Sequence, residues 1–254
     1  MTIEFRTRGP VAIVTIDRPD VANAIDRPTA MALADAFRRF DADDALHVAV
    51  LTGANGTFCA GADLKGMRDP ERVVRLEREG DGPVGPTRMI LGKPVIAAVE
   101  GHAVAGGLEV ACWCDLRVAA EGAVFGVFCR RFGVPLIDLG TVRLPRLIGH
   151  SRAMDLILTG RPVEAKEAYE IGLANRLAPN GAALDAALEL ARQISAFPQL
   201  CLRNDRLSAL AQWSMDWDEA TANEVRLGMA TLRTGSAVEG ASRFVAGQGR
   251  GGAF

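Results

Sequence analysis

Two loops rich in small residues hold the parts of this chain that are best placed for chemistry. The first is Phe58–Lys65 (FCAGADLK) and the second is Glu100–Glu109 (EGHAVAGGLE), and each follows a strand-like run. In the second loop, Gly106 and Gly107 come just before an apolar, helix-like run. A helix N-terminus offers free N–H groups and the positive end of the helix dipole, so this position favours an anionic oxygen. The small residues of the first loop let a ligand approach the main chain, where a backbone N–H can donate to it.

Glu109 is the acidic residue that follows these glycines. It comes three residues after Gly106, about one helical turn further on. Its carboxylate is therefore expected near any oxygen that the Gly106 N–H holds, a position suited to proton transfer. An acidic residue in the first turn of a helix is also explained by the helix dipole alone. Taken singly, Glu109 leaves both interpretations open.

Asp138 is a candidate for a second proton-transfer group. It lies in an apolar run, with Leu136, Ile137 and Leu139 as neighbours. Burial among such residues would raise the pKa of its carboxyl and suit it to work with Glu109. An aspartate just before a helix can instead be an N-cap. The sequence supports the two interpretations about equally.

Strand-like and helix-like runs alternate along most of the chain, which favours an α/β fold with buried strands. A different stretch, residues 66–86, starts as a charged helix-like run and continues as GDGPVGP, which cannot hold regular structure. We expect it to be a mobile flap beside the site, with a solvated surface helix and loop as the alternative. The expected strands are 11–16, 47–52, 94–99 and 116–120, and the expected helices include 28–40, 151–159 and 184–196.

Composition narrows the classes of partner. The chain has 254 residues and a net charge of -2, which calls for neither nucleic acid nor a membrane surface as partner. Its five cysteines form no Cys-x-x-Cys pair and follow no signal-like segment, so reduced thiols in a cytoplasmic protein are expected. The three histidines are scattered and have no metal-ligand spacing, so no metal site is expected.

Together with shorter strings, the two loops resemble the enoyl-CoA hydratase/isomerase (crotonase) family. The matching strings occur in family order and spacing from about residue 11 to residue 180, and the helical tail matches more loosely. Besides the two loops, they are Asn23–Ile25, Cys114–Ala119, Phe125–Gly126, Arg143–Gly149, Leu158–Arg161 and Gly172–Leu177.

The resemblance implies a fold and an assembly. We expect a crotonase-like spiral of β-β-α turns that carries the acyl-CoA site over residues 1–195. A C-terminal helical region, residues 196–254, would serve in trimerisation, and such trimers often pair into hexamers. The family uses no metal or redox cofactor, and coenzyme A enters as part of the substrate.

The resemblance also implies roles for residues. The backbone N–H groups of Ala62 and Gly106 would grip the thioester carbonyl oxygen and stabilise an enolate, with Glu109 as catalytic carboxylate. Lys65 is expected to face a phosphate or the pantetheine of coenzyme A, or else to be a solvated surface lysine. The expected substrate-binding residues are Ala22, Ala24, Ala60, Asp63, Leu64, Lys65, Gly107 and Cys129.

Cys129 departs from the family pattern. Hydratases of the family usually have a second glutamate at this position, and a thiol with a pKa near 8.5 does not simply replace a carboxylic acid. Adding water across a double bond needs a base and an acid, work that two tuned carboxylates divide well. We expect an acyl-CoA enzyme that stabilises a thioester enolate, with hydration of a 2-enoyl-CoA as the first candidate. Isomerisation, thioester hydrolysis and acyl-CoA binding without turnover are the alternatives.

Overall fold

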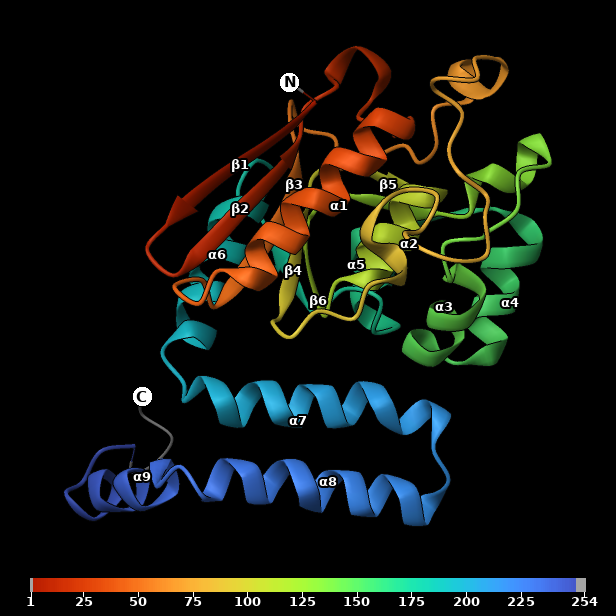
Figure 1. The fold of residues 1–254 in the computed structure, drawn as a ribbon. Helices are drawn as coiled ribbons and strands as arrows, with labels where there is room; N and C mark the ends of the chain where they lie inside the picture. Colours follow the sequence, from red (N-terminus) through yellow and green to blue (C-terminus); the bar gives the residue numbers. More distant parts are fainter. Residues whose placement is uncertain (1, 250–254) are drawn as a thin grey trace. The chain divides into compact units, whose positions relative to one another are not determined.

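The computed structural model describes residues 2–249, which divide into two units after Ile194 (Figure 1). The first unit holds two β-sheets and the helices that pack on them. The second holds the last helices of the chain.

A six-stranded sheet forms the centre of the first unit. The edge strand β1 pairs with β2 in the antiparallel direction, and all other neighbouring strands are parallel. The four strands predicted from the sequence are confirmed to within one residue at each end, as β2, β3, β4 and β6. In spatial order the sheet contains β1 (Ile3–Arg8), β2 (Val11–Ile16), β3 (Val48–Gly53), β4 (Val95–Val99), β6 (Leu116–Ala120) and β9 (Arg176–Ala178).

A smaller sheet of three short strands lies in the same unit. It consists of β5 (His102–Val104), β7 (Val124–Gly126) and β8 (Pro162–Glu164). The chain passes from β4 to β5, through α2 (Gly106–Trp113), and back to β6 and β7. Each such turn places one strand in each sheet and then adds a helix, which gives the β-β-α spiral that was expected.

Helices α1 (Arg27–Ala42) and α6 (Ala183–Ser195) belong to two separate hydrophobic clusters of the large sheet. Successive residues of a strand point to opposite faces, so each buried strand supplies both clusters. On one side, α6 packs its alanines and Leu188 against Val48 and Val50. The cluster on the other side includes Leu51 with Leu33, Phe37 and Phe40 of α1.

The three remaining helices of the first unit lie between the strands along the chain. They are α3 (Gly140–Ile148), α4 (His150–Thr159) and α5 (Ala165–Glu170).

The flap, residues 66–86, contains no α-helix. A 3-10 turn at Leu64–Arg68 leads into it and another at Pro86–Arg88 leads out, with turns and extended chain between them. Arg27 holds the flap from α1, because its backbone N–H donates to the Arg72 carbonyl and its Nε to the Val73 carbonyl, both at 2.9 Å. Because the residues between the two 3-10 turns form no helix, the alternative of a solvated surface helix and loop is wrong about the helix.

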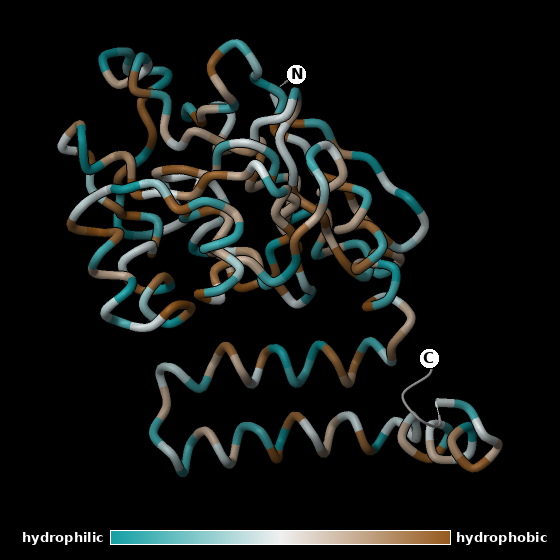
Figure 2. The backbone as a smooth tube through the Cα atoms, turned by 180° about the vertical axis from the view of Figure 1, so that it is seen from behind, coloured by the Kyte–Doolittle hydropathy of each residue, from teal (hydrophilic) through white to brown (hydrophobic). Residues whose placement is uncertain are grey.

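The second unit contains α7 (Gln199–Ala211), α8 (Trp217–Leu232) and α9 (Ser236–Val245). The buried Asn204 joins two of its helices, since Nδ2 donates to the Thr231 hydroxyl at 3.0 Å and to the Leu227 carbonyl at 3.1 Å. Hydrophobic and hydrophilic residues alternate along α7 and α8 (Figure 2). No helix within residues 2–249 is long and apolar enough to cross a membrane. The large exposed hydrophobic residues of this unit include Trp213, Trp217, Met229 and Phe244.

Candidate active site

A mainly apolar cavity of about 380 Å³ lies between the two small-residue loops, the flap and the segment before α3. Three acidic residues are the charged members of its lining, Asp63, Glu109 and Asp138. Eight of the predicted site residues line this one cavity: Ala60, Ala62, Asp63, Leu64, Gly106, Glu109, Cys129 and Asp138.

The two small-residue loops meet through their backbones. A Cβ atom on Gly61 would lie 2.7 Å from the Gly106 nitrogen, and a Cβ on Gly106 would lie 3.4 Å from the Ala62 nitrogen. Gly61 also has φ +94°, a conformation that side chains rarely adopt. Glycine at position 61 therefore lets the two loops approach each other, which brings the amides of Ala62 and Gly106 close together.

These two amides are unpaired, whereas their neighbours are held. Ile25 N donates to the Gly61 carbonyl at 2.7 Å and Asp63 N to the Ile25 carbonyl at 2.8 Å, which fixes the first loop. Within residues 2–249, the N–H groups of Ala62 and Gly106 donate to no protein acceptor. Unpaired donors in a protected position are costly, so both are available to an oxygen of a ligand. The Gly106 amide is in addition the first of α2.

Glu109 is held by a small backbone nest at the start of α3. Its Oε1 accepts from Asp138 N at 2.9 Å and from Gly140 N at 2.8 Å. Leu139, between these two amides, has φ +67°, and such a left-handed residue lets alternate N–H groups point to one anion. In the described part of the chain, Oε2 has no hydrogen-bond partner. Glu109 therefore anchors one oxygen and leaves the other for the cavity, although the residue is only 3% exposed.

Asp138 is held by Val84 of the flap and by Thr87, which follows the flap. Its Oδ1 accepts from Val84 N at 3.1 Å and from the Thr87 hydroxyl. The N-cap position of α3 is Leu139, which makes no side-chain cap, so the N-cap interpretation of Asp138 is wrong. Arg143 tightens this arrangement by donating to the carbonyls of Asp138 at 3.1 Å and Thr87 at 2.7 Å.

The surroundings of both carboxyls shift their protonation, and the charge of Asp138 acts on Glu109. Burial, followed by the charge of Asp138, raises the pKa of Glu109 from its ordinary 4.5 to about 7. Burial also raises the pKa of Asp138. A carboxyl with a pKa of about 7 is protonated in part of the molecules at neutral pH, so Glu109 can hold a proton or a negative charge there. It can then take a proton and give a proton within one reaction.

Cys129 lies in the same cavity, in the 3-10 turn Phe128–Phe132. Burial raises the pKa of its thiol, and the charge of Glu109 adds to this effect. The thiol is therefore neutral at physiological pH. It does not supply the second carboxylate that the resemblance led us to expect at this position.

Four predicted substrate-binding residues do not line the cavity. Ala22 lies next to the first loop, since its carbonyl accepts from Ala60 N at 3.1 Å. Ala24 is buried and Lys65 is exposed. Gly107 packs behind the start of α2, where a Cβ would lie 2.1 Å from the Cys59 carbonyl.

The sequence did not indicate four residues that hold Glu109 and Asp138 in place: Val84, Thr87, Leu139 and Arg143. None of the four has a local sequence signal for this role. Each acts through a backbone group or through a partner far away in the chain.

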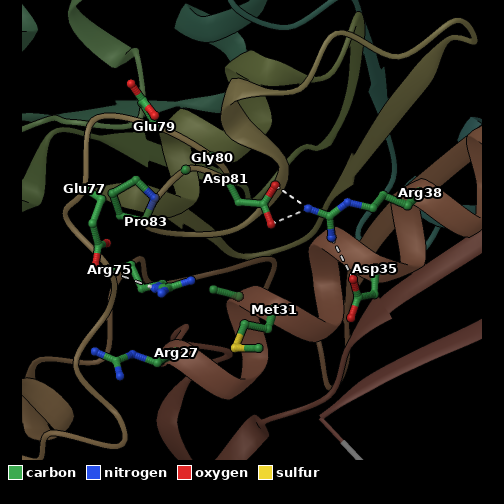
Figure 3. A pocket seen from close by; sticks show the side chains of 12 residues that line it. Arg27, Met31, Asp35, Arg38, Arg75, Glu77, Glu79, Gly80, Asp81 and Pro83 are labelled. Carbon is green, nitrogen blue, oxygen red and sulfur yellow. Dashed lines mark hydrogen bonds and ion pairs between the residues drawn. The ribbon is translucent and has the colours of Figure 1, made fainter.

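The outer side of the flap borders a second hollow of about 220 Å³, which is lined by charged residues (Figure 3). Arg38 of α1 pairs there with both carboxylate oxygens of Asp81 and with Asp35. Arg75 lies 3.7 Å from Glu77. Pro83 lines this hollow and also the apolar cavity, so the flap is a thin wall at this point.

The comparison with known families agrees with this arrangement. A family model described as enoyl-CoA hydratase/isomerase matches residues 6–248. The chain belongs to this family. The resemblance predicted from the loops is thereby confirmed.

Individual relatives cover nearly the whole chain. Enoyl-CoA hydratase EchA19 of Mycobacterium tuberculosis is 38% identical over 244 residues, which is 93% of this chain and 91% of the relative. An (E)-benzylidenesuccinyl-CoA hydratase of Thauera aromatica is 35% identical and covers 83% of this chain and 82% of its own length. A crystal structure of an enoyl-CoA hydratase from Mycobacterium tuberculosis superposes with a TM-score of 0.91, at 39% identity and 96% coverage of both chains. The crotonase-like fold is therefore confirmed.

Proposed function

We propose that the protein adds water across the double bond of a 2-enoyl-CoA. One observation carries this proposal: the unpaired amides of Ala62 and Gly106 and the carboxyl pair Glu109–Asp138 all face one apolar cavity. The relatives named as hydratases support the same class of reaction.

The two amides would act on the thioester carbonyl. Negative charge grows on its oxygen when a nucleophile adds to the conjugated carbon, C3. Preformed N–H donors stabilise that charge, and removing one typically costs roughly 3 to 4 kcal/mol of barrier stabilisation. The Gly106 amide adds the favourable end of the α2 dipole.

The carboxyl pair would balance the protons. The oxygen of water bonds to C3 and its proton passes to the ionised carboxylate. The protonated partner gives its proton to C2 as the enolate collapses back to the thioester. The pair ends with one proton, as it began, so no further acid is needed and the Cys129 thiol takes no part.

The proposal also includes the binding of coenzyme A, the assembly of the protein and its location. Ala22, Ala24, Ala60, Leu64 and Lys65 would line the channel of the coenzyme A moiety, and no other cofactor is required. The exposed hydrophobic residues of the second unit support assembly into a homotrimer or a dimer of trimers. A cytoplasmic location fits the reduced cysteines, all five of which are free.

Cys129 favours one alternative reaction, the isomerisation of an enoyl-CoA double bond. A proton shuttle needs a single carboxylate, which Glu109 alone would supply. The presence of Asp138 is the reason why we propose hydration, because hydration divides the acid and base roles between two groups.

Loss of the enoyl absorbance of crotonyl-CoA tests the proposal. We expect clear turnover by the wild type and a decrease of about 10²- to 10⁴-fold in Glu109→Gln. The matched control is Glu170→Gln on α5, whose side chain is 60% exposed and 3.9 Å from Lys166, and it should keep full activity. Turnover of a 3-enoyl-CoA without hydration of crotonyl-CoA would instead assign the isomerase reaction.

A further inference from the structure

Two arginines and two aspartates form an ion-pair cluster beside the first loop. Arg18 lies 2.9 Å from Asp26 and 3.1 Å from Asp63. Arg72 lies 3.3 Å from Asp26 and 2.7 Å from Asp63. The side chains of Asp26 and Asp63 are only 9% and 3% exposed, so water screens these pairs poorly.

The cluster joins the start of α1, the first loop and the flap. Asp63 follows the unpaired amide of Ala62 directly. Asp26 is the N-cap of α1, and its Oδ1 accepts from Thr29 N at 3.2 Å. Arg72 belongs to the flap, whose next residues, Val73 and Val74, line the cavity.

Arg72 is the member of the cluster that connects the flap to the loop. Its backbone carbonyl is fixed by Arg27 N at 2.9 Å, and its stem covers Gly66, where a Cβ would lie 3.2 Å from that of Arg72. Its guanidinium also balances charge. Without it, two poorly screened carboxylates would share the single cation Arg18, and like charges at this distance repel.

We propose that Arg72 is a positioning residue that fixes the Ala62 amide, through Asp63, at the same time as it holds the cavity wall Val73–Val74. This inference deepens the proposed function and rests on it. Through Arg72, the position of the flap around an acyl group is then linked to the position of the Ala62 N–H that donates to the thioester carbonyl oxygen. An error of about 1 Å in such a donor can cost 10²-fold in rate.

A chromophoric thioester tests this inference. When 4-dimethylaminocinnamoyl-CoA binds, hydrogen bonds to its carbonyl oxygen pull electrons across the conjugated system and move its absorption to longer wavelength. We expect Arg72→Ala to lose most of this shift and to lower kcat for crotonyl-CoA by about 10- to 100-fold. Arg72→Lys keeps the charge but reaches one carboxylate at a time, so it should restore part of both effects.

Arg75→Ala is the matched control. Arg75 lies three residues further along the flap, its side chain is 66% exposed, and it pairs with Glu77, which is outside the cluster. It should keep the wild-type shift and rate. The same shift in Arg72→Ala and Arg75→Ala would overturn the inference, as would a wild type that shows no shift at all. A wild-type shift that is lost in Arg72→Ala, in a protein that does not hydrate crotonyl-CoA, would support the role of Arg72 and contradict hydration alone.

Discussion

The two ends of the cavity are built in different ways. At the amide end, Gly61 and Gly106 bring two stretches of main chain into contact, and the functional groups are backbone N–H groups. At the acid end, Glu109 and Asp138 are held by a nest, a hydroxyl and the flap. The first depends on the absence of side chains, and the second depends on side chains from several segments.

This difference gives a physical reason to expect the family pattern to be kept more strictly at the amide end than at the acid end. Few residues can replace a glycine whose Cβ would strike a neighbouring backbone. A carboxyl can be delivered to a cavity from more than one position. Here Cys129 stands where the resemblance led us to expect a second glutamate, while Asp138 brings a buried carboxyl into the same cavity.

The largest effect that separates the two ends is expected from Gly61→Ala. The added Cβ would lie 2.7 Å from the Gly106 nitrogen, and φ +94° strains any side chain. Both amides would move, so kcat/KM should fall by about 10³-fold or more. Steady-state kinetics with crotonyl-CoA measure the change. Leu76→Ala, at the other wall, removes a 64% exposed cavity residue and should cost only a few-fold, mainly in KM. Equal losses in the two variants would contradict the distinction.

A smaller effect is expected at the acid end, in how the thermal stability of Glu109→Gln depends on pH. The raised pKa of Glu109 means that the folded state holds this proton more tightly than the unfolded state does. Its contribution to stability is thus complete below pH 4.5 and is lost as the pH rises to about 7, by about 3 kcal/mol in total. Gln cannot ionise. Between pH 5 and pH 8, Glu109→Gln should therefore lose less thermal stability than the wild type does.

Thermal unfolding midpoints at the two pH values measure this difference. Glu170→Gln, at an exposed carboxylate, is the control and should follow the wild type. A Glu109→Gln variant with the same pH dependence as the wild type would mean that the carboxyl is not destabilised by burial.

The two ends also differ in what the sequence could predict. The glycine loops and the buried strands leave local signals, so the fold, the placing of Gly106 at a helix start and the position of Glu109 were predictable. The nest around Leu139 depends on a left-handed φ at a residue that is not glycine, and Thr87 reaches Asp138 across 51 positions of the chain. Such long-range contacts leave no periodic pattern. The charged run of the flap has a helix-like composition but forms no helix. Its contacts with Arg27 and Asp63 are also long-range, and the local composition does not indicate them.

The most direct test of the account is a double-mutant cycle on the carboxyl pair. Crotonyl-CoA hydration would be measured for the wild type, Glu109→Gln, Asp138→Asn and the double variant. If the two carboxyls work as one unit, each single variant loses nearly all the activity that the double variant loses, because either change stops the same proton cycle. Activity close to the wild type in Asp138→Asn, with the fold intact and Glu109→Gln inactive, would contradict the pair and leave Glu109 as the only catalytic carboxylate.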